Sequence, residues 1–326
     1  MVCCTQVTAI DGTITDAWLD KNKDILYLTT SQPNRFVAYD TKSKTIFREI
    51  TLSKAPTCFS VSEDGRKAVV GHGGLISSID MDKFSVAKTV TINESVFDIE
   101  WGANDWVCYT LGSDVQWSRL YWVNLQTNEK QTSEKSIYGS CVVKKVPQQD
   151  YIIGSESNLS SGVYVFDINK RQITNDIFTS FGQFWFSADG AYLFDARKHV
   201  CRTSAVLKQS EISFIDMLNY NSSNATWIDH HAASNSLWVL PSLFSHTPYN
   251  TNAEVLQLEA TDYTVVKTYQ YDDYYRLATN GATTEYPVKA YYVFANGLGT
   301  EVIVIKAVTD NYNATHNWLL EHIPVN

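Results

Sequence analysis

The chain has 326 residues, of which 44% are hydrophobic and 13% aromatic, and its formal net charge at pH 7 is −9. This composition excludes an intrinsically disordered chain. The acidic balance argues against a nucleic-acid partner and against docking on anionic lipid, because either would need a basic surface. No segment is long and apolar enough to cross a membrane, so we expect no membrane insertion.

Short apolar runs separated by polar turns recur along the whole chain, and helical periodicity is absent almost everywhere. In chain order the predicted strands are 15–19, 25–29, 36–40 and 46–52; 57–61, 67–70, 75–80 and 86–92; 96–101, 106–111 and 120–124; 141–146, 151–154, 163–167 and 173–178; 183–186, 192–195, 199–203 and 212–218; 226–229, 237–240, 254–258 and 265–271; and 274–278, 289–294, 301–307 and 318–323.

The repeat has a period in the forties, roughly four strands per unit, as in the blades of β-propellers. Its first turns are centred near Asn22, Asp64, Asn104, Gln149, Asp189 and Asn235. Ser-x-Asp-Gly at 62–65 and 187–190 supplies hairpin chemistry, since Gly tolerates positive φ and Asp caps its own turn. A β-sandwich would explain short strands but not this repeat.

We therefore predict an all-β fold: one domain that is a seven-bladed β-propeller of four-stranded antiparallel blades. The predicted blades are 11–52, 53–92, 93–136, 137–180, 181–218, 219–271 and 272–326. Residues 6–10 are expected to add a strand to the last blade and so close the ring, because closure removes exposed sheet edges.

The third strands of several units end on an apolar residue followed by Asp or Asn, at Asp40, Asp80, Asn124 and Asp167. This pattern resembles the repeat of bacterial YVTN-type and WD40-like propellers over nearly the whole chain, although the Gly-His and Trp-Asp marks of true WD40 repeats are absent. The sequence also resembles surface-anchored propellers of gut anaerobes. That resemblance implies a periplasmic, cell-surface or secreted location, while residues 1–6 are too short and polar for a signal peptide.

Six cysteines are present, and four stand singly within apolar runs, at Cys58, Cys108, Cys141 and Cys201. They are predicted to be small buried hydrophobes rather than a disulfide framework. Since no C-x-x-C pair occurs, a structural zinc site is not expected.

Candidate ligand-binding residues fall in the loops between second and third strands and in the connections between blades. They are Trp117, Arg119, His246, Tyr249, Tyr274 and Arg276. Brought together around the channel mouth, they would form an aromatic-floored cup for a glycan, because sugars stack on aromatic rings and charged groups bond their hydroxyls.

Evidence for catalysis is weaker. His72, His199 and His246 fall in or beside these loops and could hold a divalent metal, but their spacing gives no support, so no metal or cofactor is predicted. His230 and His231 would point to opposite faces of a strand. The sequence has no nucleophile elbow, phosphate loop or dinucleotide fingerprint.

The favoured hypothesis is an extracytoplasmic binding or scaffolding propeller that recognises a carbohydrate or a protein on its loop-rich face. The alternative is a propeller enzyme, a polysaccharide lyase or a hydrolase or lactonase, with a site at the channel mouth and with or without a metal. A purely structural module is the third possibility. Propeller active sites are assembled from distant blades, so the absence of a local motif decides little.

Overall fold

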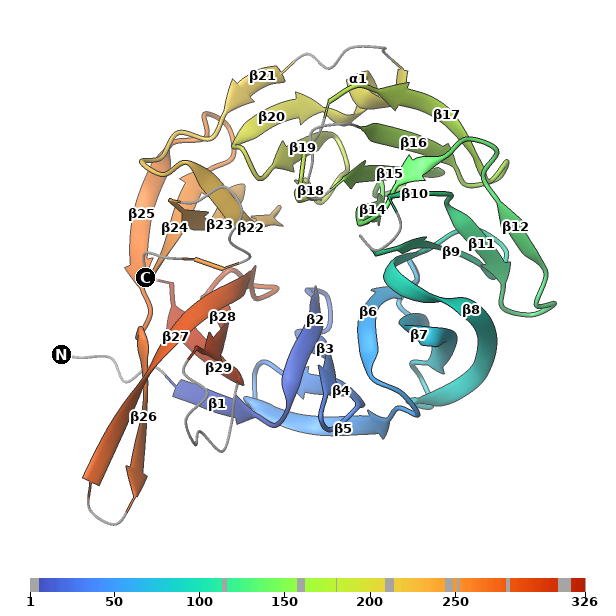
Figure 1. Cartoon of the computed structure of the whole chain (residues 1–326). Coiled ribbons are helices and arrows are strands. Elements are labelled where there is room, and N and C mark those ends of the chain that lie inside the picture. Colours follow the sequence, from blue (N-terminus) through green and yellow to red (C-terminus); the bar gives the residue numbers. More distant parts are fainter. Residues whose placement is uncertain are drawn as a thin grey trace.

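The computed structural model is a ring of β-sheets (Figure 1). It describes residues 6–112, 116–156, 162–179, 181–208, 214–243, 249–250, 253–279, 282–309 and 318–325, with the backbone alone for residues 6, 275–279 and 282–284. The all-β propeller architecture predicted from the repeat is confirmed.

Four of the blade sheets have four antiparallel strands each. They are β2 (Thr13–Asp20), β3 (Ile25–Ser31), β4 (Arg35–Asp40) and β5 (Thr45–Thr51); β14 (Cys141–Lys145), β15 (Tyr151–Glu156), β16 (Val163–Asp167) and β17 (Gln172–Ile177); β18 (Phe184–Phe186), β19 (Tyr192–Asp195), β20 (His199–Arg202) and β21 (Phe214–Met217), with α1 (Thr203–Lys208) before β21; and β22 (Asn224–His231), β23 (Ser236–Ser242), β24 (Glu254–Glu259) and β25 (Val265–Gln270).

The described residues form six blade sheets, so the prediction of seven separate blades is wrong. One sheet has six strands: β6 (Pro56–Val61), β7 (Lys67–Asp80), β8 (Ser85–Trp101), β9 (Trp106–Leu111), β11 (Tyr121–Asn124) and β12 (Lys130–Thr132). It joins the segments predicted as second and third blades. The reason is local: Gly73 pairs with Ser95 and so continues the β7–β8 ladder at a point where a loop and a boundary between blades were expected. Glycine lets the backbone bend there while the ladder continues.

The last sheet contains both ends of the described chain. Its order is β1 (Gln6–Ile10), β29 (Trp318–Pro324), β28 (Glu301–Val308), β27 (Ala282–Ala295) and β26 (Tyr274–Thr279). The predicted ring closure is confirmed, because β1 pairs antiparallel with β29 from Gln6–His322 to Ile10–Trp318. The strand predicted at 274–278 is not an inner strand: it is β26, which forms with β27 a hairpin that projects from the ring (Figure 1).

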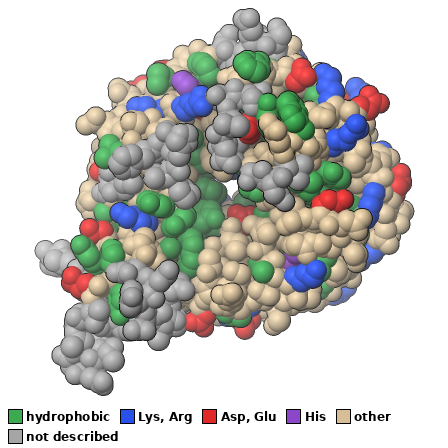
Figure 2. Space-filling model, in the orientation of Figure 1, with side chains coloured by type: hydrophobic (Ala, Val, Ile, Leu, Met, Phe, Trp, Pro, Cys, Tyr) green, Lys and Arg blue, Asp and Glu red, His purple; other side chains and the backbone are tan. Residues whose placement is uncertain are grey.

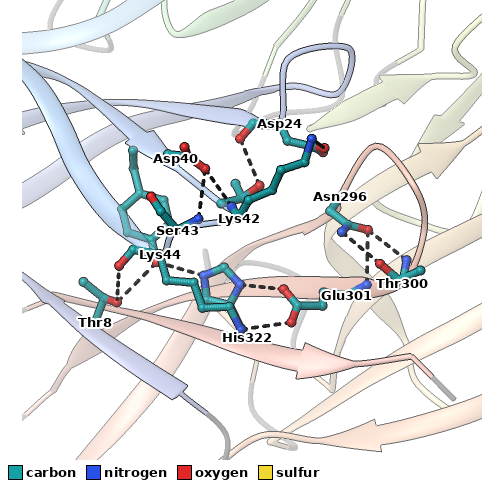
Figure 3. Close-up of polar contacts among 12 residues, drawn as sticks. Thr8, Asp24, Asp40, Lys42, Ser43, Lys44, Asn296, Thr300, Glu301 and His322 are labelled. Atoms are coloured by element: carbon teal, nitrogen blue, oxygen red, sulfur yellow. Dashed lines mark hydrogen bonds and ion pairs between the residues drawn. The ribbon is translucent and has the colours of Figure 1, made fainter.

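Polar side chains reinforce this closure between the first and last sheets. His322 lies between two partners, the Tyr39 hydroxyl at 2.9 Å from Nε2 and the Glu301 carboxylate at 3.2 Å from Nδ1. Lys44 reaches the same Glu301 at 2.9 Å, so β29, β28 and the β4–β5 turn converge on one carboxylate (Figure 3). Thr8 of β1 bonds the Tyr39 hydroxyl at 3.2 Å, which ties the closing strand to the neighbouring blade.

The Asp and Asn residues that mark the repeat cap the turns that follow them. The Asp40 carboxylate accepts the N–H groups of Lys42 and Ser43 at 2.8 and 3.1 Å, and Asn124 accepts two N–H groups at 2.9 Å in the equivalent turn. Such capping fixes the hairpin between outer strands. The repeat signature therefore reports turn chemistry rather than a binding site.

The hydrophobic core lies between neighbouring sheets. One cluster packs Tyr27 and Phe36 of the first sheet against Phe59 and Ile79 of the six-stranded sheet. The four cysteines predicted to be buried hydrophobes are free and buried, which confirms that prediction. A small ribbon, β10 (Trp117–Ser118) with β13 (Ile137–Tyr138), lies outside these sheets.

Candidate functional site: the central channel

The ring encloses a channel of about 1200 Å³. Figure 2 shows the opening with hydrophobic side chains on its wall. The wall is built from the innermost strands β2, β6, β14, β18 and β22 and the C-terminal parts of β8 and β27. Since successive residues of a strand point to opposite faces, each strand contributes alternate side chains to the channel.

Aromatic side chains form one part of the wall around Trp227 of β22. Its ring centroid lies 5.8 Å from that of Trp185, 4.7 Å from Tyr292 and 5.6 Å from Phe294, all in edge-to-face arrangements. Such pairs stabilise one another beyond the area that they bury. This part of the channel wall is therefore aromatic and apolar.

Carboxylates line the wall and connect neighbouring strands. Asp16 of β2 accepts the N–H of Phe59 at 2.9 Å, Asp98 of β8 accepts the N–H of Val143 at 2.8 Å, and Asp229 of β22 accepts the N–H of Ala295 at 2.9 Å. In each case the acceptor and the donor belong to consecutive inner strands. These carboxylates therefore hold the ring together and also place negative charge in the channel.

Burial makes these carboxyls weaker acids than usual. Loss of solvation raises the pKa of Asp16 to about 6 and also raises the pKa values of Asp98 and Glu100. Backbone N–H groups and the Lys144 ammonium pull the pKa of Asp98 the other way, but burial dominates.

Lys144 of β14 is the cation that faces these carboxylates. Its Nζ lies 5.4 Å from the ring centroid of Trp227, 5.6 Å from that of Trp185 and 5.8 Å from that of Phe184. Burial lowers the pKa of Lys144, although Asp98, Asp16 and Glu100 each act to raise it.

One face of the ring is braced across the channel mouth. Lys21 pairs with Asp229 at 2.7 Å and donates to the His230 carbonyl at 2.6 Å, and Lys145 pairs with Glu63 at 2.5 Å. Each contact joins a turn between first and second strands to the end of an inner strand of another blade. The turns of this face also line the channel, among them residues 20–23 and 62–65 and Gly297.

Four of the six predicted ligand residues have described side chains, and no contact between any two of these four is recorded. The Trp117 ring packs on Tyr138 at 4.0 Å, with 55% of Trp117 exposed, and Arg119 donates to the Ser133 carbonyl at 3.0 Å. Tyr249 lies at 5.8 Å from Tyr291 of β27, in the last sheet. Tyr274 begins β26 on the projecting hairpin (Figure 1).

Arg276 also belongs to β26, where only the backbone is described, and His246 lies outside the described residues. The channel residues that sequence reasoning missed are Asp16, Asp98 and Lys144. A signal was present, since each is a charged residue inside a predicted first strand that is otherwise largely apolar.

Two of the three histidines considered as metal ligands, His72 and His199, lie in the described part of the chain. His72, expected in a loop, is fully buried in β7 and bonds the Lys54 and Ala55 carbonyls at 3.1 and 3.2 Å. His199 is held by Asp195 at 2.8 Å. Within the part of the chain that the structure describes, no three potential ligands gather to hold a metal ion.

Comparison with solved structures finds a similar propeller over the whole chain. The β-propeller domain of Cps50 (Swd1) from Myceliophteria thermophila has a TM-score of 0.71 and 10% identity, with 99% of this chain and 100% of that chain covered. By fold, this chain is a β-propeller, and the predicted resemblance to WD40-like repeats is supported. At this identity the likeness of the chain to its neighbour concerns the fold alone. No family model and no curated protein matches the sequence.

None of the helices in the described residues could span a membrane. The resemblance to YVTN-type repeats stays a prediction.

Proposed function

We propose that this WD40-like propeller is a binding or scaffolding module that docks a protein partner on the face opposite the braced turns. The observation that carries the proposal is the asymmetry of the ring. Ion pairs tie turns of one face to the ends of inner strands in other blades, whereas the other face carries the β10–β13 ribbon with the exposed Trp117 ring supported by Tyr138. Exposed, supported aromatic rings are enriched where proteins bind partners.

Charge indicates the kind of partner. The chain carries a net charge of −9, and part of this acidic excess lies in the channel wall, where Asp16, Asp98 and Glu100 outnumber Lys144. Complementary potentials accelerate association and disfavour wrong partners. We therefore favour a partner segment with net positive charge.

A carbohydrate partner is the second candidate, and Trp117 is the observation that favours it. A half-exposed indole fixed on Tyr138 is a platform on which the C–H face of a sugar ring could stack. The predicted extracytoplasmic location would suit either partner and stays part of the proposal.

The test compares the two faces. Trp117→Ala removes the aromatic platform, and Leu298→Ala, at a residue that is 73% exposed in the turn after β27, is the matched control on the braced face. Both variants and the unmodified protein are assayed on arrays of basic peptides, acidic peptides and glycans. Binding that is lost at least tenfold only in Trp117→Ala supports the proposal. Binding that is lost only in Leu298→Ala, or preference for acidic peptides, refutes it.

A further inference from the structure

One inner strand, β2, presents an exposed aromatic ring and a carboxylate side by side in the channel wall. Trp18 lines the channel and is 39% exposed, and its ring stacks on that of Tyr27 at a centroid distance of 6.0 Å with an interplanar angle of 18°. Asp16 also lines the channel, and because it lies two residues before Trp18, both side chains are on the same face of β2. The wall therefore has an indole platform, supported from behind, next to a hydrogen-bond acceptor.

The carboxylates of Asp16 and Asp98 are fixed in place and still have acceptor capacity. Asp16 accepts the N–H groups of Ala17 and Phe59 at 2.8 and 2.9 Å, one on each oxygen. Two backbone N–H groups hold Asp98 in the same way, at 2.9 and 2.8 Å. Both residues line the channel and are partly exposed. Since a carboxylate oxygen has two lone pairs, each can accept one further hydrogen bond from a ligand.

Lys144 of β14 supplies a donor to the same channel. Its ammonium lies 5.4 Å from the ring centroid of Trp227 and 5.6 Å from that of Trp185. The carboxylates of Asp98 and Asp16 attract it, and aromatic faces and carboxylates both stabilise a charged lysine. Among the residues that the structure describes, the Lys144 ammonium has neither a hydrogen-bond acceptor nor an ion-pair partner at contact distance. Its N–H groups are therefore available to a ligand.

This set of groups favours a neutral ligand with hydroxyl groups over a charged one. An anion is repelled by Asp16, Asp98 and Glu100, which all line the channel. A cation is attracted by these carboxylates but leaves the donors of Lys144 without an acceptor. A hydroxyl can both donate to a carboxylate and accept from an ammonium. Sugars combine such hydroxyls with an apolar C–H face that stacks on an indole ring.

We propose that the channel is a binding site for a neutral oligosaccharide. One sugar ring stacks on Trp18 and donates a hydroxyl to Asp16, and a hydroxyl further along the ligand accepts from Lys144. The channel volume of about 1200 Å³ is larger than the roughly 300–1,000 Å³ of most small-ligand pockets, so it has room for a short chain of sugars. This site is separate from the Trp117 ribbon, and the inference does not rest on partner docking there.

The test screens the unmodified protein on an array of neutral oligosaccharides, with oligogalacturonate as the anionic comparator and oligomeric chitosan as the cationic one. The best neutral oligosaccharide and both comparators are then titrated by isothermal calorimetry. We expect the neutral oligosaccharide to bind at least about tenfold more tightly than either comparator. Absence of binding by every neutral oligosaccharide, or tighter binding of either comparator, overturns the proposal.

Substitutions of two exposed tryptophans then locate the site. Trp18→Ala should weaken binding of the neutral oligosaccharide about tenfold, whereas Trp18→Phe, which keeps an aromatic face, should retain most of the affinity. The matched control Trp117→Ala should leave the affinity unchanged. Loss of binding only in Trp117→Ala would assign the saccharide to the ribbon and refute the channel site, without refuting the proposed docking surface.

A second pair of variants tests the donor. Lys144→Met removes the ammonium but keeps the apolar length of the side chain, and it should weaken binding at least about tenfold, because a hydrogen bond to a charged group is lost. The matched control is Lys170→Met, at a lysine that pairs with Asp167 in an outer turn, and it should bind normally. Circular dichroism checks that each variant is folded, and the array result for the unmodified protein does not depend on any variant. Equal affinities of folded Lys144→Met and the unmodified protein would contradict the role of Lys144.

Discussion

The buried ion pair between Lys306 of β28 and Glu321 of β29 gives the sharpest stability prediction. Both side chains are 1% exposed, the Nζ–Oε2 distance is 2.5 Å, and Lys306 also donates to the Asp272 carbonyl at 2.6 Å. Lys306→Met keeps the side-chain length but leaves the Glu321 carboxylate buried without its counter-charge. Removal of one partner of such a pair costs about 3–5 kcal/mol.

The same reasoning predicts that the double variant Lys306→Met with Glu321→Leu recovers most of this loss. Replacing both charges by apolar groups of similar volume is often neutral or stabilising, because the cost of burying the ions disappears with them. The Asp272 carbonyl at the base of the projecting hairpin still loses its donor, which leaves a residual cost of about 1 kcal/mol.

The measurement is urea denaturation of the unmodified protein, both single variants and the double variant, followed by tryptophan fluorescence and circular dichroism. These four proteins form a double-mutant cycle, from which we expect a coupling free energy between Lys306 and Glu321 of about 2 kcal/mol or more. A loss of unfolding free energy below 1 kcal/mol in Lys306→Met, or a double variant less stable than both single variants, would refute the interpretation that each buried charge is costly without its partner.

Three further predictions concern ring closure, pH and close packing. Deletion of residues 1–10 removes the β1–β29 ladder and the fully buried Ile10, so Tm in a thermal scan should fall by several degrees; an unchanged curve contradicts this. Burial raises the pKa of Asp16 to about 6, so the folded state holds this proton more tightly than the unfolded state does. The contribution of Asp16 to stability therefore falls as the pH rises from about 4 to 6. In urea titrations the stability difference between the unmodified protein and Asp16→Asn should shrink or reverse as the pH rises through that window, and a constant difference would count against this reasoning. Gly297→Ala should destabilise the fold by more than about 1 kcal/mol, because a Cβ would collide with the Lys21 carbonyl, whereas Gly73→Ala has room beside Ser95; equal denaturation midpoints would disprove the packing argument.

Local sequence alone was enough to identify most of the blade strands and several of the turns, although it missed short strands such as β12. The Ser-x-Asp-Gly segment at 62–65 forms the predicted hairpin turn, with Ser62 Oγ 2.7 Å from Asp64 Oδ1 and Gly65 at a φ of 66°. Alternation of apolar residues and turn chemistry are properties of a few neighbouring residues, so a single sequence displays them.

The number of blade sheets depended on tertiary pairing. Whether the chain near Gly73 forms a loop or stays in a ladder is decided by Ser95, which comes to lie opposite it. The strand at 274–278 was recognised, but its place outside the ring was not, because it pairs with residues 282–287 of β27, a segment that had not been predicted as a strand.

The site was the least predictable part. Sequence determined that Asp16, Asp98 and Lys144 are charged residues within inner strands, but only the closed ring places Lys144 beside Trp185 and Trp227. Desolvation and through-space charge depend on all the surrounding strands together, and these strands are separated by tens to hundreds of residues in sequence. The chemistry of the channel is therefore a property of the folded ring, whereas the ring itself is encoded in each repeat.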